Sequence, residues 1–535
     1  MIFRIALTVA MLAFSGSIAA QPVTVSVTLA PDMETNQSGR LIVFVSPVEV
    51  DAEPQKSVNT SPLNPTETAV AARDIVAFSP GDIATVDGEV GSFPTAFSDL
   101  APGNYRFQAV LDRDYSYNYR GRGPGDIVSD VADATLPGTM PILQLNRIIE
   151  PSDPTAFIDR MPENEQADAR AAYDAVEEVA FVSPRLSAFW GRDMTIRGWI
   201  ALPPDYTPDG PTFPVVYITN GFSSNLAYAR QRATRALLNM QNGLWPPMIW
   251  VILDQSLPTG THEFADSVNN GPWGTALTEE LIPSLEKLYA MDATPEGRFL
   301  TGHSSGGWAS LWLQVRYPSM FGGSWPTAPD ASSFRDFTNI DIYAEGANAY
   351  RNADGTPVPL IRNDGDVIAT IEEFSRLEAT LGIYGGQLAS FDWVFSPKGP
   401  DGRPMQIFDR TTGAVDPQVA AYWRQNYDIA HIVRRDWTKL SDDLNGKIHL
   451  IVGDADTFYL DGPARLFEQV LDELGAEADF VYRPGRTHFD LFTQGENRTG
   501  LMRDIAWDIY AVARPEAERP SDSLPVTDPS QLTAE

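Results

Sequence analysis

The chain contains no cysteine, which excludes disulfide bonds, thiolate nucleophiles and metal sites with sulfur ligands. A chain of 535 residues can bury a core large enough to fold without such cross-links. Cationic residues are also scarce, because 39 Lys and Arg stand against 71 Asp and Glu and leave a net charge of -32. A chain this acidic repels nucleic acid and anionic membranes, so neither is expected as a partner.

Long apolar runs are missing except near the start of the chain. There, Arg4 precedes an apolar run from residue 5 to 14, and small residues follow as far as Ala20. The run is too short for a permanent membrane anchor and is typical of a secretory signal. We therefore expect a signal peptide at 1–20, a periplasmic or secreted location, and no membrane span in the mature chain.

The pattern of residues 21–145 differs from that of the rest of the chain. A turn signal at 101–104 precedes an alternating stretch, 105–111, that is typical of a half-buried strand. Strand-like runs separated by Gly and Pro predict a small all-β, sandwich-like N-terminal domain. Residues 146–175 are expected to form a linker with a polar, helix-prone part at 162–178.

Residues 176–514 show strands alternating with helices. The expected strands are 194–202, 214–219, 248–253, 298–301, 448–452 and 478–482, and the expected helices are 275–289, 463–474 and 502–513. This alternation predicts an α/β fold with a mostly parallel central sheet covered on both faces. The polar stretch 331–440 interrupts it and is expected to form a cap. The Pro-rich, acidic tail 515–535 is expected to be disordered.

The segment Gly302-His303-Ser304-Ser305-Gly306 matches the motif G-x-S-x-G. An apolar run precedes it and a helical pattern follows, which is the context of a nucleophile elbow. The small residues of such a motif let a strand and a helix approach closely around an exposed serine. Ser304 is therefore the predicted nucleophile.

A serine hydroxyl needs a base, and the chain has five histidines. His488 lies in the loop after the last predicted strand, whereas the other histidines lie in the elbow, in a buried strand or in loop and insertion segments, so we assign His488 the role of the base by position and by elimination. A carboxylate must orient the base, and it should follow the preceding strand. Asp454 and Asp456 both lie there. Asp456 is favoured because Gly453, three residues earlier, leaves the chain room to turn inward.

The charge that develops on a substrate oxygen needs fixed donors. The backbone N–H of Ser305 lies at a helix start, directly after the nucleophile, and Phe222 follows the strand 214–219. We expect these two N–H groups to form the oxyanion hole. The sequence contains no phosphate loop, dinucleotide fingerprint or metal-ligand cluster, so no cofactor and no metal are expected.

These motifs resemble the putative esterase family of α/β-hydrolases, which includes enterochelin esterases and S-formylglutathione hydrolases (esterase D). The resemblance covers about 175–330 and 445–515 and implies an α/β-hydrolase fold with the triad order Ser304, Asp456, His488. The chain departs from the family pattern in two places. Asn220-Gly221 stands where many members have His-Gly, and the insertion at 331–440 is longer than in compact members. The matching segments are 202–206, 214–221, 279–283, 302–307, 316–318, 321–322, Gly453 with Asp456, and His488.

The sequence thus predicts an exported serine esterase that acts through an acyl-enzyme. An acyltransferase of the same fold and a catalytically silent hydrolase-fold binding protein remain alternatives. The substrate is a small-molecule or polysaccharide-linked ester, and siderophore lactones, feruloyl or acetyl groups and small thioesters all stay open. The oligomeric state and the role of the β domain are not determined by the sequence.

Overall fold

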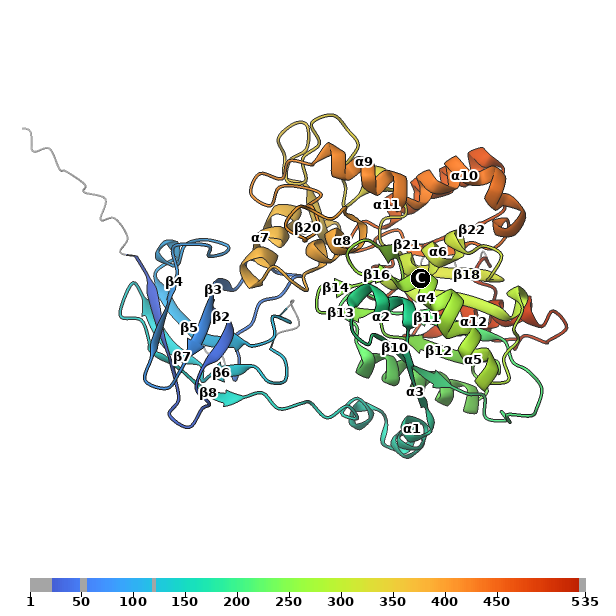
Figure 1. Cartoon of the computed structure of the whole chain (residues 1–535), viewed down its shortest axis with the longest axis horizontal. Coiled ribbons are helices and arrows are strands. Elements are labelled where there is room, and N and C mark those ends of the chain that lie inside the picture. Colours follow the sequence, from blue (N-terminus) through green and yellow to red (C-terminus); the bar gives the residue numbers. More distant parts are fainter. Residues whose placement is uncertain (1–21, 49–54, 118–121, 529–535) are drawn as a thin grey trace, which may run out of the picture.

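The computed structural model describes residues 22–48, 55–117 and 122–528. Two bodies, each built on an eight-stranded sheet, lie side by side (Figure 1). No helix among the described residues has the length and apolarity needed to cross a bilayer. The expected signal peptide, 1–20, lies outside the described residues.

The N-terminal body is an all-β domain with strand order β3-β2-β5-β6-β8-β1-β4, and β7 pairs with β5. Its longest strands pair antiparallel, with Leu41 opposite Leu111 and Val43 opposite Ala109. Alternate residues of these strands are fully buried in one apolar cluster. The strands are β1 (Thr24–Leu29), β2 (Gln37–Pro47), β3 (Ala69–Phe78), β4 (Ile83–Asp87), β5 (Gly103–Asp112), β6 (Ile127–Ser129), β7 (Ala132–Leu136) and β8 (Leu143–Ile148).

The second sheet has the order β22-β21-β18-β17-β11-β12-β10-β9. Neighbours from β22 to β12 pair in parallel, whereas β10 is antiparallel to both β12 and β9, so the sheet is mixed. Its strands are β9 (Glu177–Val182), β10 (Thr195–Ala201), β11 (Val215–Thr219), β12 (Ile249–Leu253), β17 (Arg298–His303), β18 (Gly323–Thr327), β21 (His449–Gly453) and β22 (Asp479–Arg483). Short pairs are formed by β13 (Ser256–Leu257), β14 (Gly260–Thr261), β15 (Asp266–Ser267) and β16 (Gly271–Pro272).

Both faces of the second sheet are buried. Val216 and Ile218 of β11 belong to one apolar cluster, and Val215 and Tyr217 belong to the other. A strand covered on both faces must be apolar throughout, which explains the continuous apolar run seen in the sequence. The helices of this body are α1 (Glu163–Ala175), α2 (Pro184–Trp190), α3 (Leu226–Gln241), α4 (Trp273–Ala276), α5 (Ile282–Leu288), α6 (Ser305–Arg316), α11 (Asp461–Leu474) and α12 (Gly500–Ala513).

The expected single helix at 275–289 is divided into α4, a π-helical turn at Leu277–Leu281, and α5. Pro283 lies at the first turn of α5. Proline has no N–H to donate to the preceding turn, so a widened turn accommodates it.

The expected linker contains α1 in its helix-prone part, and this helix buries Ala169 and Ala172 and packs on α3. The sequence predicts a disordered tail from residue 515 onward, whereas residues 515–528 are ordered in the structure. Ser523 donates to Asp504 of α12 at 2.7 Å, and Val526 is buried. Contacts with α12 therefore hold a segment whose composition alone predicts no fold.

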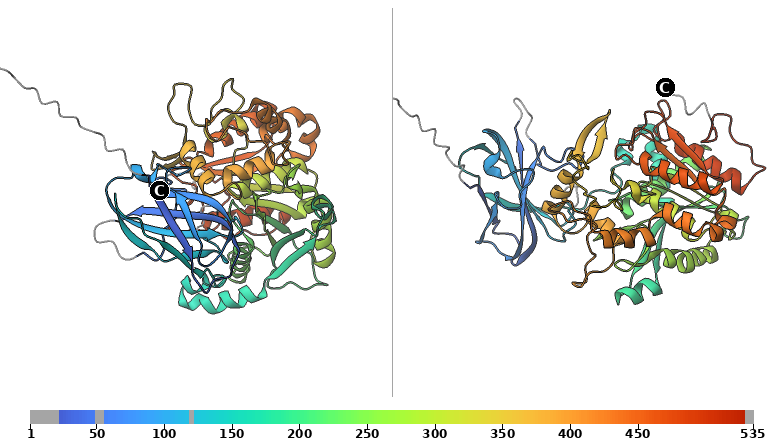
Figure 2. Two further views of the ribbon diagram at one scale, coloured as in Figure 1. Left: turned by 60° about the vertical axis from the view of Figure 1, so that its left-hand side comes forward. Right: turned by 90° about the horizontal axis from the view of Figure 1, so that it is seen from above.

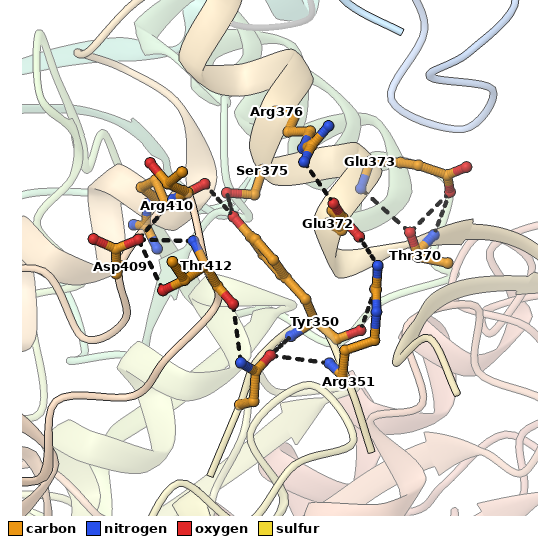
Figure 3. A network of polar contacts seen from close by, with 12 residues as sticks. Tyr350, Arg351, Thr370, Glu372, Glu373, Ser375, Arg376, Asp409, Arg410 and Thr412 are labelled. Carbon is orange, nitrogen blue, oxygen red and sulfur yellow. Dashed lines mark hydrogen bonds and ion pairs between the residues drawn. The ribbon is translucent and has the colours of Figure 1, made fainter. Parts of the chain in front are cut away.

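Residues 331–440 form β19 (Pro359–Asn363), β20 (Asp366–Thr370), α7 (Ile371–Leu381), α8 (Gln387–Phe395), α9 (Pro417–Asn426) and the first part of α10 (Ile429–Leu444). A polar network fixes this insertion (Figure 3). The Tyr350 hydroxyl donates to the Arg410 carbonyl at 2.7 Å, and Glu372 accepts from Arg351 at 2.6 Å. The insertion, in yellow and orange, lies between the β domain and the rest of the second body (Figure 2).

Helix α7 contacts the β domain directly. Leu377 and Leu381 share an apolar cluster with Ile42 and Phe44 of β2. Beside them, the Arg40 guanidinium donates to the Thr380 carbonyl at 2.7 Å. The β domain therefore packs on the insertion.

Candidate active site

Ser304 lies at the turn between β17 and α6 with φ 60° and ψ -128°. This conformation is rare for a residue other than glycine and persists only where neighbours enforce it. The Ser304 N–H donates to the Thr327 carbonyl at 3.1 Å, and the Ser304 carbonyl accepts from Asp330 at 3.3 Å and from Trp308 at 3.0 Å. Bonds on both sides of the residue therefore hold the strained backbone.

The glycines of the motif are required by close packing. A Cβ atom added to Gly302 would lie 2.1 Å from the Gly306 carbonyl oxygen, and one added to Gly306 would lie 2.3 Å from the Thr219 carbonyl oxygen. Both contacts are with backbone, which cannot move aside. The strand, the helix and the adjacent strand β11 thus meet at van der Waals distance around Ser304.

His488 and Asp456 form a buried pair. The His488 Nδ1 and Asp456 Oδ2 atoms are 2.9 Å apart, and the side chains are 4% and 0% exposed. The other oxygen of Asp456 accepts the N–H groups of Phe458 at 2.9 Å and Leu460 at 3.2 Å. Asp454 instead accepts the Gly485 N–H at 2.7 Å in a turn. The structure therefore brings Asp456, and not Asp454, to His488.

His303 connects the elbow to this pair. Its ring centre is 4.4 Å from that of His488, and its Nδ1 is 3.2 Å from the Thr327 hydroxyl. Burial lowers the pKa of His303 well below its ordinary value, and the charges of His488 and Arg232 act in the same direction. His303 is therefore held neutral.

Within the described residues, no hydrogen bond joins the Ser304 hydroxyl to His488.

The two predicted oxyanion donors belong to two segments next to Ser304, the start of α6 and the loop after β11. Ser305 is the first residue of α6, where N–H groups have no partner within the helix. A Cβ atom added to Gly221 would lie 3.3 Å from Ser304 Cβ, so the loop that carries Phe222 lies against the serine. The Asn220 side chain donates to the Leu253 carbonyl at 3.0 Å and accepts from Arg232 at 3.1 Å. Asn220 therefore anchors this loop.

Asp330 is a site residue that sequence reasoning missed. It follows β18, is buried, and accepts the Ser305 hydroxyl at 2.6 Å. Burial raises the pKa of Asp330 to about 6, while the hydrogen bond from Ser305 opposes the rise. Its position three residues after a strand resembles that of Asp456, but the β18 sequence, Gly-Ser-Trp-Pro-Thr, gives little indication of a strand.

Glu263 is a second buried acid that the sequence did not single out. Among the described residues, neither of its carboxylate oxygens has a hydrogen-bond partner. Burial raises the pKa of Glu263 well above its ordinary value, and the charge of Asp330 adds to this. Burial therefore favours the uncharged form of the Glu263 carboxyl.

A cavity of about 40 Å³ opens at Ser304 and Asp330. Its walls are mainly apolar, and the insertion supplies most of them. The aromatic side chains are Phe337, Phe374, Phe391 and Phe458. A pocket of this composition suits an apolar group next to the serine.

The described residues contain one group of acids close enough to share a metal ion. Asp112, Asp114 and Asp126 place carboxylate oxygens within 4.8 Å of one another in the β domain. Asp112 already accepts the backbone N–H groups of Ser116 and Tyr117, and Asp126 accepts that of Gly123. These acids thus act as acceptors within their own loops.

The chain was compared with known proteins. It is 30% identical over 139 residues to the uncharacterized protein YbbA of Bacillus subtilis (strain 168), an alignment with 24% of this chain and 53% of YbbA. It is 27% identical over 172 residues to Esterase Rv1288 of Mycobacterium tuberculosis (strain ATCC 25618 / H37Rv), with 30% of this chain and 36% of that protein. The chain thus spans about half of the first relative and about a third of the second.

Solved structures with similarity include an S-formylglutathione hydrolase from Agrobacterium tumefaciens, at 14% identity and a TM-score of 0.37 over 63% of this chain and 95% of that one. Another is a ferulic acid esterase from Anaeromyces mucronatus, at 13% identity and a TM-score of 0.33 over 64% of this chain and 90% of that one.

The family model described as "Putative esterase" matches residues 187–497. The match begins in α2 and includes both the elbow at Ser304 and the buried pair of Asp456 and His488. Because it covers more than half of the 535 residues, this chain belongs to the putative esterase family.

Proposed function

We propose that the protein is an exported serine esterase that hydrolyses carboxylic esters through Ser304, His488 and Asp456. The observation that carries the proposal is the strained serine whose neighbour His303 has its ring 4.4 Å from that of the buried His488–Asp456 pair. Membership of an esterase family supports it.

In this proposal, Ser304 attacks the ester carbonyl while His488 Nε2 takes the hydroxyl proton. Asp456 holds the ring through Nδ1 and stabilises the imidazolium that forms. The negative oxygen of the tetrahedral intermediate accepts from the N–H groups of Ser305 and Phe222. His488 then returns the proton to the leaving alcohol. Water attacks the acyl-enzyme with the same base, which releases the acid and restores Ser304.

The insertion is proposed to act as a cap over the acyl group. It supplies Phe337, Phe374 and Phe391 to the cavity at Ser304. A closed apolar wall excludes water and strengthens the polar contacts at the reacting carbonyl.

The test compares hydrolysis of p-nitrophenyl acetate by the wild type and by Ser304→Ala. Loss of the nucleophile is expected to reduce kcat by more than about 1000-fold. Ser441→Ala, a change in α10 outside the site, is the matched control and is expected to keep full activity. Ser304→Ala with wild-type turnover would refute the proposal. A fluorophosphonate probe, which reacts with activated serines, is expected to label the wild type and not Ser304→Ala.

Export is proposed from the sequence of residues 1–20 alone. The mass of the protein recovered from outside the cytoplasm tests it, because cleavage near Ala20 is expected to remove that segment. A full-length cytoplasmic product would contradict it.

A further inference from the structure

A second cavity, of about 190 Å³, is lined in part by His303 of the elbow. Tyr228, Arg232 and Arg235 contribute to it from α3, and their spacing of four and three residues places them on one face of that helix. Arg498, just before the start of α12, completes the cationic lining. Three guanidinium groups therefore converge on one hollow.

The charge of this cavity is unbalanced. No Asp or Glu is among the described residues that line it. None of Arg232, Arg235 and Arg498 forms an ion pair within the described part of the chain, although acids outnumber bases 71 to 39. For comparison, Arg434 on α10 pairs with Glu473 at 2.6 Å. Three neighbouring arginines without a counterion, in so acidic a protein, are what an anion site requires.

Arg232 is the innermost of the three. It is half-buried and donates to the Asn220 side chain at 3.1 Å, in the loop that carries the predicted oxyanion donor. Arg235 and Arg498 are exposed and free to turn into the cavity. The hydrogen bond to Asn220 therefore fixes Arg232 near the active site, whereas Arg235 and Arg498 at the mouth of the cavity can change conformation.

We propose that this cavity is a subsite for an oxyanion, a carboxylate, sulfate or phosphate, carried by the ester substrate. The inference rests on the proposed function and names the substrate class of that site: an ester with one apolar part and one anionic part. The apolar part occupies the cavity at Ser304 and the anionic part the arginine cavity. Planar guanidinium groups match such oxygens in paired hydrogen bonds.

The distance between the two parts is short. His303 lines the arginine cavity, and its ring lies 4.4 Å from the ring of His488. The two cavities thus adjoin neighbouring residues of the elbow, His303 and Ser304, and in this proposal the substrate extends from one cavity to the other past the His303 ring. Trp245 and Phe492 also line the cavity and offer aromatic surface to the atoms between the ester and the charge.

The first test uses matched neutral and anionic esters. With the charge on the alcohol side, 4-acetoxybenzoate is compared with 4-acetoxybenzamide. With the charge on the acyl side, p-nitrophenyl hemisuccinate is compared with p-nitrophenyl butyrate. In at least one pair, wild-type kcat/KM is expected to be about tenfold or more higher for the anionic ester. The pair that shows the preference identifies which side of the ester the arginines bind.

Arg235→Gln and Arg498→Gln are each expected to reduce the ratio of anionic to neutral kcat/KM, and their combination is expected to remove it. Arg434→Gln is the matched control and is expected to keep the wild-type ratio. Equal rates for both members of both pairs would overturn the proposal. The proposal would also be overturned if the double variant kept the preference for the anionic ester, or if the substitutions lowered kcat/KM equally for anionic and neutral esters.

A binding measurement separates this inference from the proposed function. Benzoate is expected to raise the melting temperature of Ser304→Ala, which needs no turnover, more than benzamide does. The added combination of Arg235→Gln and Arg498→Gln is expected to abolish that difference. If the fluorophosphonate probe fails to label the wild type but benzoate binds through the arginines, the esterase proposal fails and the anion site stands. If Ser304 is labelled but neither binding nor preference depends on the arginines, the anion site fails alone.

Discussion

The two carboxyl groups nearest to Ser304 and His488 differ in what surrounds them. Asp456 has hydrogen bonds to both oxygens, from His488 and from two backbone N–H groups. Asp330 has the Ser305 hydroxyl at one oxygen, and burial raises its pKa to about 6. The stability of the folded protein is therefore expected to depend on pH through the ionisation of Asp330.

Asp330→Asn is expected to stabilise the protein at neutral pH. The native pKa of Asp330 lies above the 3.8 of an unperturbed carboxyl, so the native state holds a proton that the unfolded state loses. Its contribution to stability is full below about pH 4 and falls as the pH rises towards 6. The amide does not ionise, so the variant should gain on the order of 2 kcal/mol between pH 4.5 and 7.5. Denaturant unfolding at both pH values measures this, and an equal difference at the two would contradict it.

Gly306→Ala is expected to destabilise the protein by about 2–3 kcal/mol, because the new Cβ meets the Thr219 carbonyl. Gly103→Ala is the control, since the nearest atom to a Cβ there is 3.9 Å away. The stabilities of both variants, measured by thermal unfolding, test this prediction. A Gly306→Ala variant as stable as the control would show that strand and helix can separate at no cost.

At this scale, the sequence could predict Ser304, Asp456 and His488 because motif spacing and strand order place them together. Asp330 could not be predicted, since the strand before it contains Gly, Trp and Pro and shows no alternation. The arginines of the second cavity also escaped prediction. They come from α3 and from the segment just before α12, which only the folded chain brings together.

Among the elements, those with a local stop signal were the most predictable. Gly475 was expected to end a helix, and it adopts φ 67° directly after α11. The helix expected at 275–289 is present, but its π-helical turn was not predicted, because apolar periodicity does not register the effect of Pro283. The strand β9 was not predicted, because an edge strand with exposed acids has no continuous apolar run.

Helix α7 presents different residues to different neighbours. Phe374 lines the cavity at Ser304, and Leu377 packs on the β domain. Phe374→Ala is expected to enlarge the cavity and raise the ratio of p-nitrophenyl hexanoate to acetate hydrolysis about tenfold. Leu377→Ala, nearly one turn further along the helix, is expected to cost about 2–5 kcal/mol of stability and to leave the ratio unchanged. Rate measurements on both esters check this, and a changed ratio in Leu377→Ala alone would contradict it.

For the whole molecule, the sequence predicted a β domain ahead of an α/β body, but not their contact. The Arg40 guanidinium bonds to Thr380, 340 residues away, and no local pattern encodes so distant a pairing. The contact depends on α7, which lies inside the insertion.

Leu381→Asp is expected to uncouple the two bodies, because a carboxylate then enters an apolar cluster with no partner. Calorimetry should show the domains melting at separate temperatures. Ile383→Asp is the control, since that side chain is 54% exposed. A single transition at the wild-type temperature in Leu381→Asp would mean that the cluster does not join the domains.

The cluster shared by Leu377, Leu381 and β2 also limits how this protein can be recombined. A chimera that transplants residues 176–514 alone would leave those leucines facing water and invite aggregation. The unit that can be exchanged between proteins is therefore discontinuous in sequence. The strands of the β domain must be transferred together with α7, which follows them by more than 200 residues.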